Sequence, residues 1–551
     1  MVDGEQRLTW KEVAQRVARL AGALTSLGLQ PGDTVGVLAD NSLAVLELYF
    51  AAPTAGLVLL PLNTRLAGAE LAECLEDAHC RVVVAGPEYI DALREACPGT
   101  QVIVAGRGVS GRSLAGPRVP GLHHYDDLLT ASPLAPRGLR ADDVGYLYYT
   151  SGTTGRPKGV MLSAGGVLAG ALGCAATAGL GSGARWLHAS PMFHLADAWA
   201  IWAVTWLGGC HVTERFRAER TLRTLRAERI DWSILVPTAL ERLSAAAAAE
   251  RLDLAGMRGM LYGGAALPER TWDAAVHSLR VPLIGSYGAT ETAGTITVLP
   301  WADQLPPSAG GIGRVGRETV VTTLTLLDDE GRPADQWTAD QRTADQRSAD
   351  QRSADQRSAD QRSADQRSAD QRSADQRTAD HRLADQPQVG ELAVRSPAVM
   401  LGYRNRPEET RAALAGGWYR TGDLGRREAD GVIRLVGRRK ELVISGGENV
   451  YPAEVENVLS LHPDVRAVAV LGVPDPEWGE AVVAVIEPES GRIVDLASLR
   501  EFGRRGLAAY KLPRALHVVD ALPVTGSGKV DKPRLRSQYG NTAKHDEREP
   551  R

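Results

Sequence analysis

Cysteine is scarce in this chain, with five residues among 551. Their spacing matches no metal-ligand motif, and their odd number argues against a full disulfide framework. We therefore expect reduced thiols, as in cytoplasmic proteins. These cysteines are Cys74, Cys80, Cys97, Cys174 and Cys210. A large charge excess is also absent, since the formal net charge is −4, and this argues against a nucleic-acid partner.

Membrane-directed segments are missing as well. The first ten residues, MVDGEQRLTW, lack the basic and apolar regions of a signal peptide, so we expect a cytoplasmic protein. The uncharged run 165–184 is rich in Gly and Ala, which favours a buried helix over a membrane span. We expect no integral membrane segment. The sequence gives no indication of the oligomeric state.

The hydrophobic pattern is that of a mixed α/β protein. Short apolar runs at 34–38, 81–86, 233–237 and 259–264 alternate with helical stretches, as in parallel βαβ layers. Thr9 and Glu12 have capping-box spacing before an amphipathic helix that we expect to end at Gly28. We predict two layered subdomains of this kind.

A loop rich in glycine and hydroxyl groups, YTSGTTGRPKGV, spans residues 149–160 between two apolar runs. Glycines let main-chain N–H groups converge on an anion, and Lys158 adds a mobile ammonium group. The pattern predicts a phosphate-binding loop whose spacing differs from the Walker motif. Its candidate residues are Thr150, Ser151, Gly152, Thr153, Thr154, Gly155 and Lys158.

Residues 333–387 form eleven five-residue units, mostly SADQR or TADQR. Alanine is their only recurrent apolar residue, so they bury too little surface to offset the entropy of ordering. We expect a disordered insertion between strands in VVTTLTLLDDEG and GELAVRSP. A pentapeptide β-helix is the less favoured alternative, because Gln would occupy its core position.

Further segments occur in a characteristic order. They are PMFHLAD (191–197), YGGAAL (262–267), YGATE (287–291), GWYRTGDLG (417–425), GRRKELVISGGENVYPAEVE (437–456) and LPVTGSGKVDK (522–532). With the phosphate loop, they make the chain resemble the AMP-forming acyl-CoA synthetases of the adenylate-forming superfamily from about residue 8 to about residue 535, apart from the insertion. The resemblance implies an α/β fold whose large N-terminal core, 1–437, adds a β-rich subdomain to the two layered ones. It also implies a hinge at 438–440, a small mobile α+β domain at 441–535 and a flexible tail at 536–551.

The resemblance assigns the adenylation chemistry to three residues. Lys529 would bridge the substrate carboxylate and the α-phosphate, where a preplaced cation stabilises the charge that builds up. Glu291 would bind Mg²⁺, which prefers hard oxygen ligands, and Thr290 precedes it in the same motif.

The nucleotide site follows from the same motifs. Tyr287 would lie beside adenine, Asp423 would accept both ribose hydroxyls, and Arg438 would hold the sugar from the other side. Gly264, Ala265 and Ala266 are small enough for the base to lie against their backbone, and Gly288 belongs to the same adenine and ribose site.

The second half-reaction and the acyl group are assigned by resemblance too. Lys440 would be the hinge residue, although many relatives have Asp there, and Gly446 and Gly447 would let the pantetheine arm of CoA pass close to the backbone. The alternative for these two glycines is a plain turn before the helix at Pro452. The acyl pocket would be lined by His194, Tyr262, Gly285 and Thr292, and His194 is equally compatible with a packed core position.

The sequence thus predicts an acid–thiol ligase that uses ATP, Mg²⁺ and CoA. It would form an acyl-AMP and then an acyl-CoA from a medium- or long-chain fatty acid. Alternatives are an aryl-acid CoA ligase and an adenylation enzyme that loads a carrier protein. A remote alternative is a non-catalytic interaction protein that uses the repeat.

Overall fold

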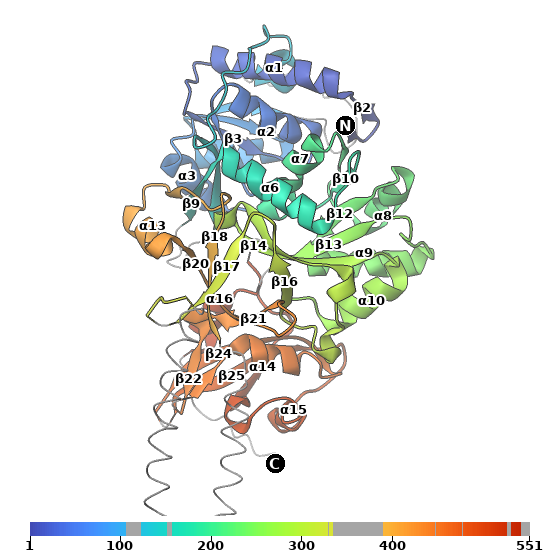
Figure 1. Ribbon diagram of the computed structural model, residues 1–551, viewed down its shortest axis with the longest axis vertical. Helices are drawn as coiled ribbons and strands as arrows, with labels where there is room; N and C mark the ends of the chain where they lie inside the picture. Colours follow the sequence, from blue (N-terminus) through green and yellow to red (C-terminus); the bar gives the residue numbers. More distant parts are fainter. Residues whose placement is uncertain are drawn as a thin grey trace, which may run out of the picture.

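A parallel sheet near the N-terminus carries the phosphate loop. The computed structural model describes residues 1–105, 123–150, 157–328, 330–333, 389–446, 448–476, 478–525 and 530–540 (Figure 1). The first sheet has the order β19 (Gly402–Tyr403), β9 (Lys158–Ser163), β8 (Val144–Thr150), β4 (Val58–Pro61), β3 (Thr34–Leu38), β5 (Val82–Ala85), β6 (Gln101–Val104), β7 (His123–His124). Strands β8, β4, β3, β5, β6 and β7 pair in parallel with one another, whereas β9 is antiparallel to β8 and β19 is antiparallel to β9.

The second sheet changes from parallel to antiparallel at β14. Its order is β17 (Thr323–Leu327), β18 (Gly390–Arg395), β20 (Tyr419–Arg427), β21 (Ile433–Arg438), β16 (Arg314–Glu318), β15 (Gly294–Leu299), β14 (Leu283–Ala289), β13 (Gly259–Gly263), β12 (Trp232–Leu235), β10 (Arg185–His188), β11 (Cys210–Thr213), β1 (Val2–Asp3), β2 (Gln6–Arg7). The β-rich part predicted from sequence therefore continues the second sheet, because β16 pairs with β15 and β21.

A smaller sheet belongs to the C-terminal part of the chain. It contains β23 (Glu448–Val450), β22 (Val443–Ser445), β25 (Gly479–Pro488), β24 (Val465–Asp475) and β26 (Ala515–Val518). This part lies at the end of the molecule opposite to α1 (Figure 1). The predicted fold class, a large α/β N-terminal part and a smaller C-terminal domain, is confirmed. The predicted domain boundaries stay predictions.

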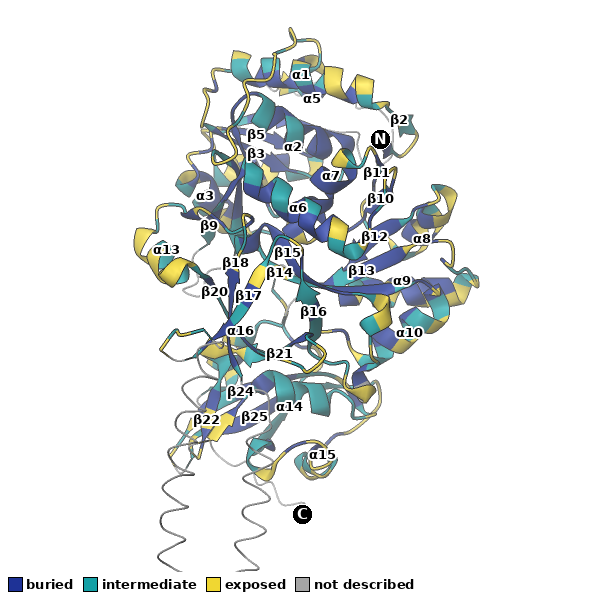
Figure 2. Cartoon of the chain, viewed as in Figure 1, coloured by how far each residue is buried: buried dark blue, intermediate teal, exposed yellow. Residues whose placement is uncertain are grey.

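Helices pack against the sheets (Figure 2). In the N-terminal part they are α1 (Trp10–Ser26), α2 (Leu43–Thr54), α3 (Gly68–Asp77), α4 (Ile90–Ala96), α5 (Tyr125–Leu128), α6 (Ala164–Ala178), α7 (Leu195–Trp206), α8 (Ala218–Ala227), α9 (Pro237–Glu250), α10 (Glu269–Leu279) and α13 (Pro407–Ala413). The C-terminal part has α14 (Pro452–Leu459), α15 (Leu496–Gly503) and α16 (Lys532–Tyr539).

Two helices test the sequence patterns directly. Helix α1 has the predicted capping box, in which the Glu12 N–H donates to Thr9 Oγ1 at 3.3 Å and the Thr9 N–H donates to Glu12 Oε2 at 2.7 Å. Helix α6 lies inside the uncharged run and packs against α7 and β15, as expected for a buried helix. No helix among the described residues is long and apolar enough to cross a membrane.

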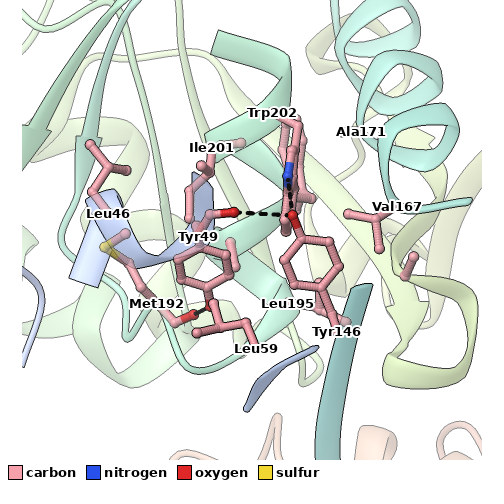
Figure 3. Close-up of a cluster of buried hydrophobic side chains, with 14 of the residues drawn as sticks. Leu46, Tyr49, Leu59, Tyr146, Val167, Ala171, Met192, Leu195, Ile201 and Trp202 are labelled. Carbon is pink, nitrogen blue, oxygen red and sulfur yellow. Dashed lines mark hydrogen bonds between the residues drawn. The ribbon is translucent and has the colours of Figure 1, made fainter. Parts of the chain in front are cut away.

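A buried aromatic cluster supports the strand that leads into the phosphate loop (Figure 3). The Trp202 indole donates to the Tyr146 hydroxyl at 3.1 Å, and that hydroxyl donates to the Tyr49 carbonyl at 3.2 Å. The Tyr49 hydroxyl donates to the Met192 carbonyl. A buried polar group that lacks a hydrogen-bond partner lowers the free energy of unfolding by about 1 to 3 kcal/mol. These hydrogen bonds therefore fix β8 relative to the segment before His194.

The insertion begins and ends at a β-hairpin. Strands β17 and β18 are antiparallel, with Leu327 opposite Glu391, so the strands predicted to flank the insertion are confirmed. After β17 the chain turns at once, because Leu327 also bridges Pro333. The expected disorder of 333–387 concerns residues of which the structure describes only Pro333.

Deletion of residues 338–382 is expected to leave the ligase activity unchanged, because the register between β17 and β18 stays the same when the loop between them is shortened. Loop closure scales with the logarithm of length, so the shorter loop should stabilise the fold by about 1 kcal/mol. Turnover and melting temperature of the deletant check this, with a Gly/Ser segment of equal length as the matched control. A deletant that folds but is inactive contradicts the prediction.

Candidate active site

The ends of the phosphate loop lie opposite each other at the edge of the first sheet. Thr150 closes β8, Lys158 opens β9, and the two residues pair across the antiparallel ladder. The intervening Ser151, Gly152, Thr153, Thr154 and Gly155 lie outside the described residues. The strands therefore define where the loop emerges.

Lys158 lies in a charged contact with the segment around β19. Its ammonium group forms an ion pair with Glu409 of α13 and lies 5.3 Å from the centre of the Tyr403 ring. Tyr403 is itself in β19, which pairs with β9. The candidate phosphate ligand thus has a carboxylate and an aromatic face as neighbours.

Glu291 lies in the short 3-10 helix η2 (Thr290–Thr292), which follows β14. The Tyr403 hydroxyl donates to Glu291 Oε1 at 2.9 Å, and the Met400 N–H donates to the Glu291 carbonyl at 2.8 Å. Burial and the Glu291 carboxylate raise the pKa of Tyr403, which keeps its hydroxyl protonated as a donor. Tyr403 therefore contacts both Lys158 and Glu291, which brings these two predicted residues together.

This arrangement fits a magnesium ion that arrives with its nucleotide. Mg²⁺ is usually bound through one or two carboxylates together with phosphate oxygens and water, rather than by a cage of protein ligands. Glu291 supplies such a carboxylate, oriented by Tyr403. Among the described residues, no group of three or more His, Cys, Asp or Glu forms a dedicated metal site.

Asp423 connects the second sheet to the predicted ribose site. The Tyr287 hydroxyl donates to Asp423 Oδ2 at 2.6 Å, and Arg438 Nε lies 2.9 Å from Asp423 Oδ1. Burial and the Asp423 carboxylate raise the pKa of Tyr287 well above its usual value. These three predicted residues meet in one cluster, in which Asp423 is only 7% exposed whereas the Arg438 side chain is 48% exposed.

The residues expected beside adenine lie at the ends of β13 and β14. Gly264, Ala265 and Ala266 are exposed, and Gly264 has a φ of +81°, which favours glycine. A Cβ on Gly288 would lie 1.8 Å from the Gly294 carbonyl oxygen, so only glycine fits there. Their contact with adenine stays a prediction.

The predicted acyl-pocket residues divide into two groups. Tyr262 and Gly285 are neighbours, and a Cβ on Gly285 would lie 3.2 Å from the Tyr262 hydroxyl and 3.4 Å from Gln304 Nε2. The Tyr262 hydroxyl donates to Gln304 Oε1 at 3.0 Å. Thr292, in contrast, is fully buried, and its hydroxyl lies 3.0 Å from the Ala289 carbonyl oxygen, which supports the turn at η2.

His194 occupies the N-cap position of α7, with its ring 4.6 Å from that of Phe193. Its role, like that of Thr292, as a pocket-lining residue stays a prediction. Sequence reasoning missed Gln304, which lies outside every motif and reaches Tyr262 only through the fold.

The predicted hinge and CoA residues begin the C-terminal part. Lys440 lies in the 3-10 helix η6 (Arg439–Glu441), and burial together with Arg438 lowers its pKa. Gly446, with a φ of +63°, donates its N–H to the Trp478 carbonyl at 2.8 Å, between β22 and β23.

Gly447 and Lys529 lie outside the described residues. The bridge between Val524 and Val530 shows that the segment holding Lys529 starts and ends at paired positions.

A buried histidine pair was not recognised in the sequence. His188 Nδ1 lies 2.7 Å from Asp197 Oδ2, and His188 Nε2 lies 2.9 Å from His211 Nδ1. His211 Nε2 in turn lies 3.0 Å from Thr205 Oγ1. Asp197 belongs to the PMFHLAD segment, where only His194 had been considered. This network anchors the first turn of α7, and hence His194, to the second sheet.

Because of this buried histidine pair, we expect the fold to be less stable at acidic pH. Burial and the neighbouring His188 lower the pKa of His211 well below its ordinary 6.5. At a mildly acidic pH, His211 is therefore neutral in the folded state but protonated in the unfolded chain. The contribution of neutral His211 to the free energy of unfolding is therefore complete above pH 6.5. As the pH falls below this value, the free energy of unfolding decreases by up to about 1.4 kcal/mol per pH unit for this one group. Thermal melts of His211→Gln should show a weaker pH dependence than the wild type between pH 7.5 and 5.5. The exposed His277→Gln is the control, and equal slopes in all three proteins would contradict the expectation.

Comparisons with known proteins agree with this geometry. A family model described as AMP-binding enzyme matches residues 1–339, and one described as AMP-binding enzyme C-terminal domain matches residues 454–529. The chain is 35% identical over 98% of its length to a feruloyl-CoA synthase of Amycolatopsis sp., of which it covers 95%. It is 32% identical over 97% of its length to an indoleacetate–CoA ligase of Aromatoleum aromaticum, of which it covers 93%.

A further relative and a solved structure extend the match. The chain is 30% identical over 97% of its length to a long-chain-fatty-acid–CoA ligase of Mycobacterium tuberculosis, covering 94% of it. It superposes on ATP-bound MatB from Rhodopseudomonas palustris with a TM-score of 0.79 at 28% identity, covering 98% of this chain and 96% of the other. With the predicted nucleotide residues gathered around Tyr403 and Asp423, these matches show that the chain belongs to the AMP-binding enzyme family and is an AMP-forming carboxylate–CoA ligase of the adenylate-forming superfamily.

Proposed function

We propose that this ligase acts on a carboxylic acid with an aromatic ring that carries a polar substituent. The observation that carries this proposal is the contact of Tyr262 and Gln304 beside Gly285. A Cβ on Gly285 would press against Leu299, the Tyr262 hydroxyl and the Gln304 amide, so only a thin, flat group suits this position. The Tyr262 hydroxyl, which donates its proton to Gln304, can still accept a hydrogen bond from a ring substituent. A site built to hydrogen-bond a substrate hydroxyl discriminates strongly against analogues that lack it. The feruloyl-CoA synthase and indoleacetate–CoA ligase matches support the same class.

A medium- or long-chain fatty acid is the second candidate. Gly285 and Gly294 carry no side chain, which suits a deep pocket, and a long-chain-fatty-acid–CoA ligase is among the relatives. A Cβ on Gly294 would come within 3.5 Å of Trp199 Cβ, however, so the space beside Gly294 is already narrow. The narrow geometry at both glycines favours the flat aromatic group.

In the adenylation step, the chain's residues position ATP and stabilise charge. Lys158 and the phosphate loop hold the β- and γ-phosphates, Asp423 and Arg438 hold the ribose, and Tyr287 with Gly264 flanks the base. Lys529 stabilises the charge that develops as the carboxylate attacks the α-phosphate. Magnesium bound at Glu291 would neutralise phosphate charge.

In the thioester step, the C-terminal domain rotates about 438–440 so that the β22–β23 hairpin faces the acyl-AMP. Relocation of a domain between two half-reactions removes one set of groups and brings in another. Gly446 lies at the tip of this hairpin, where a Cβ would lie 2.9 Å from the Trp478 ring, so a residue without a side chain keeps the tip narrow for the pantetheine arm to pass. We propose a cytoplasmic location for the enzyme, which the free state of the described cysteines supports.

A panel of acids tests the proposal. The purified chain is incubated with Mg-ATP, CoA and either ferulate, cinnamate without ring substituents, decanoate or palmitate, and AMP and thioesters are measured by mass spectrometry. We expect the ferulate thioester, with cinnamate weaker by at least about tenfold in kcat/KM. Palmitoyl-CoA as the main product would favour the fatty-acid candidate. Acyl-AMP without thioester would indicate a carrier-protein acceptor, and no AMP from any of these acids would overturn the proposed substrate class.

A further inference from the structure

The phosphate-loop lysine already has a protein counter-ion. Lys158 is 17% exposed and forms an ion pair with Glu409, whose side chain is 38% exposed. A lysine ammonium carries one positive charge, so a carboxylate in contact with it reduces its attraction for a phosphate. Any nucleotide or pyrophosphate oxygen that binds Lys158 must therefore compete with Glu409.

The contact is built into the fold rather than made by two loose surface chains. Strand β19 pairs with β9, with Gly402 opposite Met161 and Tyr403 opposite Val160, and the Arg404 N–H donates to the Gly159 carbonyl at 2.7 Å. These backbone bonds place α13 directly beside Lys158.

Two further bonds fix the start of α13. The Tyr403 N–H donates to Thr410 Oγ1 at 2.9 Å, and the Thr410 hydroxyl lies 2.8 Å from the Arg406 carbonyl oxygen. A Cβ on Gly402 would lie 2.7 Å from Thr410 Cγ2, so glycine is required for this close approach. Glu409, the neighbour of Thr410, is thus held within reach of Lys158.

The same segment also reaches the candidate magnesium ligand. Tyr403 donates to Glu291, and its ring lies under the Lys158 ammonium group. When a phosphate engages Lys158, Glu409 is the group on this segment that must give up its ion-pair partner. Its displacement costs free energy when ATP binds, and its return stabilises the site when pyrophosphate leaves.

We propose that Glu409 is a positioning residue that acts through Lys158, as an internal counter-ion that weakens binding of pyrophosphate and ATP and so promotes pyrophosphate release. This inference rests on the proposed phosphate-binding role of Lys158. A partly exposed ion pair contributes up to about 1 kcal/mol, which corresponds to a change of about fivefold in affinity.

The test measures binding of inorganic pyrophosphate and of Mg-ATP to the full-length chain by calorimetry, in the wild type and in Glu409→Gln. We expect the dissociation constants of both ligands to fall by about fivefold in Glu409→Gln. The matched control is Glu408→Gln, an exposed acid in the same helical turn, which should bind like the wild type. Wild-type affinities in Glu409→Gln would overturn the inference and leave Glu409 as a structural tether.

Two more variants separate the possible failures. Lys158→Ala should weaken pyrophosphate binding, and an unchanged affinity in this variant would instead refute the phosphate-binding role of Lys158. Glu409→Asp keeps the charge at a shorter reach, so its affinities should fall between those of the wild type and Glu409→Gln. If Glu409→Gln fails to fold in a thermal melt, Glu409→Asp provides the measurement, and wild-type affinities there would overturn the inference.

Discussion

Replacing Lys529 with alanine is expected to lower the rate of acyl-adenylate formation by about a thousandfold, while acyl-AMP supplied from outside is still converted to the thioester. The reason is that the ammonium group stabilises charge only in the first half-reaction. The segment that carries Lys529 begins and ends at the bridged residues Val524 and Val530, so the substitution should leave its base intact. Rates of AMP formation and of thioester formation from acyl-AMP check the two steps separately.

The matched control for this experiment is Lys511→Ala. Lys511 is another lysine of the C-terminal part, and its ammonium group pairs with Glu454 at 2.6 Å. It should retain both half-reactions. Equal loss of both half-reactions in Lys529→Ala would mean that the lysine supports folding instead of adenylation.

The second large effect is expected for Glu291→Gln, which should lower adenylation by about a hundredfold and raise the magnesium concentration needed for half-maximal rate. Glutamine keeps a carbonyl oxygen that can accept the Tyr403 hydrogen bond, so the change removes charge while the local geometry is retained. The measurement is AMP formation as a function of magnesium concentration.

Tyr403→Phe serves as the comparison for Glu291→Gln. It removes the hydroxyl that donates to Glu291 but leaves the carboxylate in place, so the expected loss is about fivefold, as for one hydrogen bond. A normal magnesium requirement in Glu291→Gln would exclude Glu291 as a metal ligand. An equal loss in both variants would instead assign the effect to orientation of η2.

Local patterns predicted much of the fold. The capping box at Thr9, the buried strand β3 and the strands on both sides of the insertion follow from short-range spacing, and each is confirmed. The continuity of the β-rich strands with the second sheet was not predictable in this way. It depends on the pairing of β16 with both β15 and β21, and the paired strands β16 and β21 are far apart in sequence.

The candidate site shows the same division. Asp423, Tyr287 and Arg438 were predicted from motifs, and the fold brings them into contact. Tyr403 and Glu409 were missed because the roles assigned to them depend on contacts with Glu291 and Lys158, which are far away in the sequence. Tyr403 lies 112 residues from Glu291, and no local periodicity links the two. His211 was missed for a similar reason, since its partner His188 belongs to a different strand.

The hairpin that brackets the insertion also bears on how the gene can change. Strand register at Leu327 and Glu391 is set by the ladder itself, and both ends of the repeat array leave from the same end of that ladder. Adding or removing a whole unit keeps the reading frame and leaves every strand pair in place. A change in repeat number through slippage during DNA replication should therefore leave the fold unchanged. We expect the number of repeats to differ between close relatives whose catalytic segments are nearly identical.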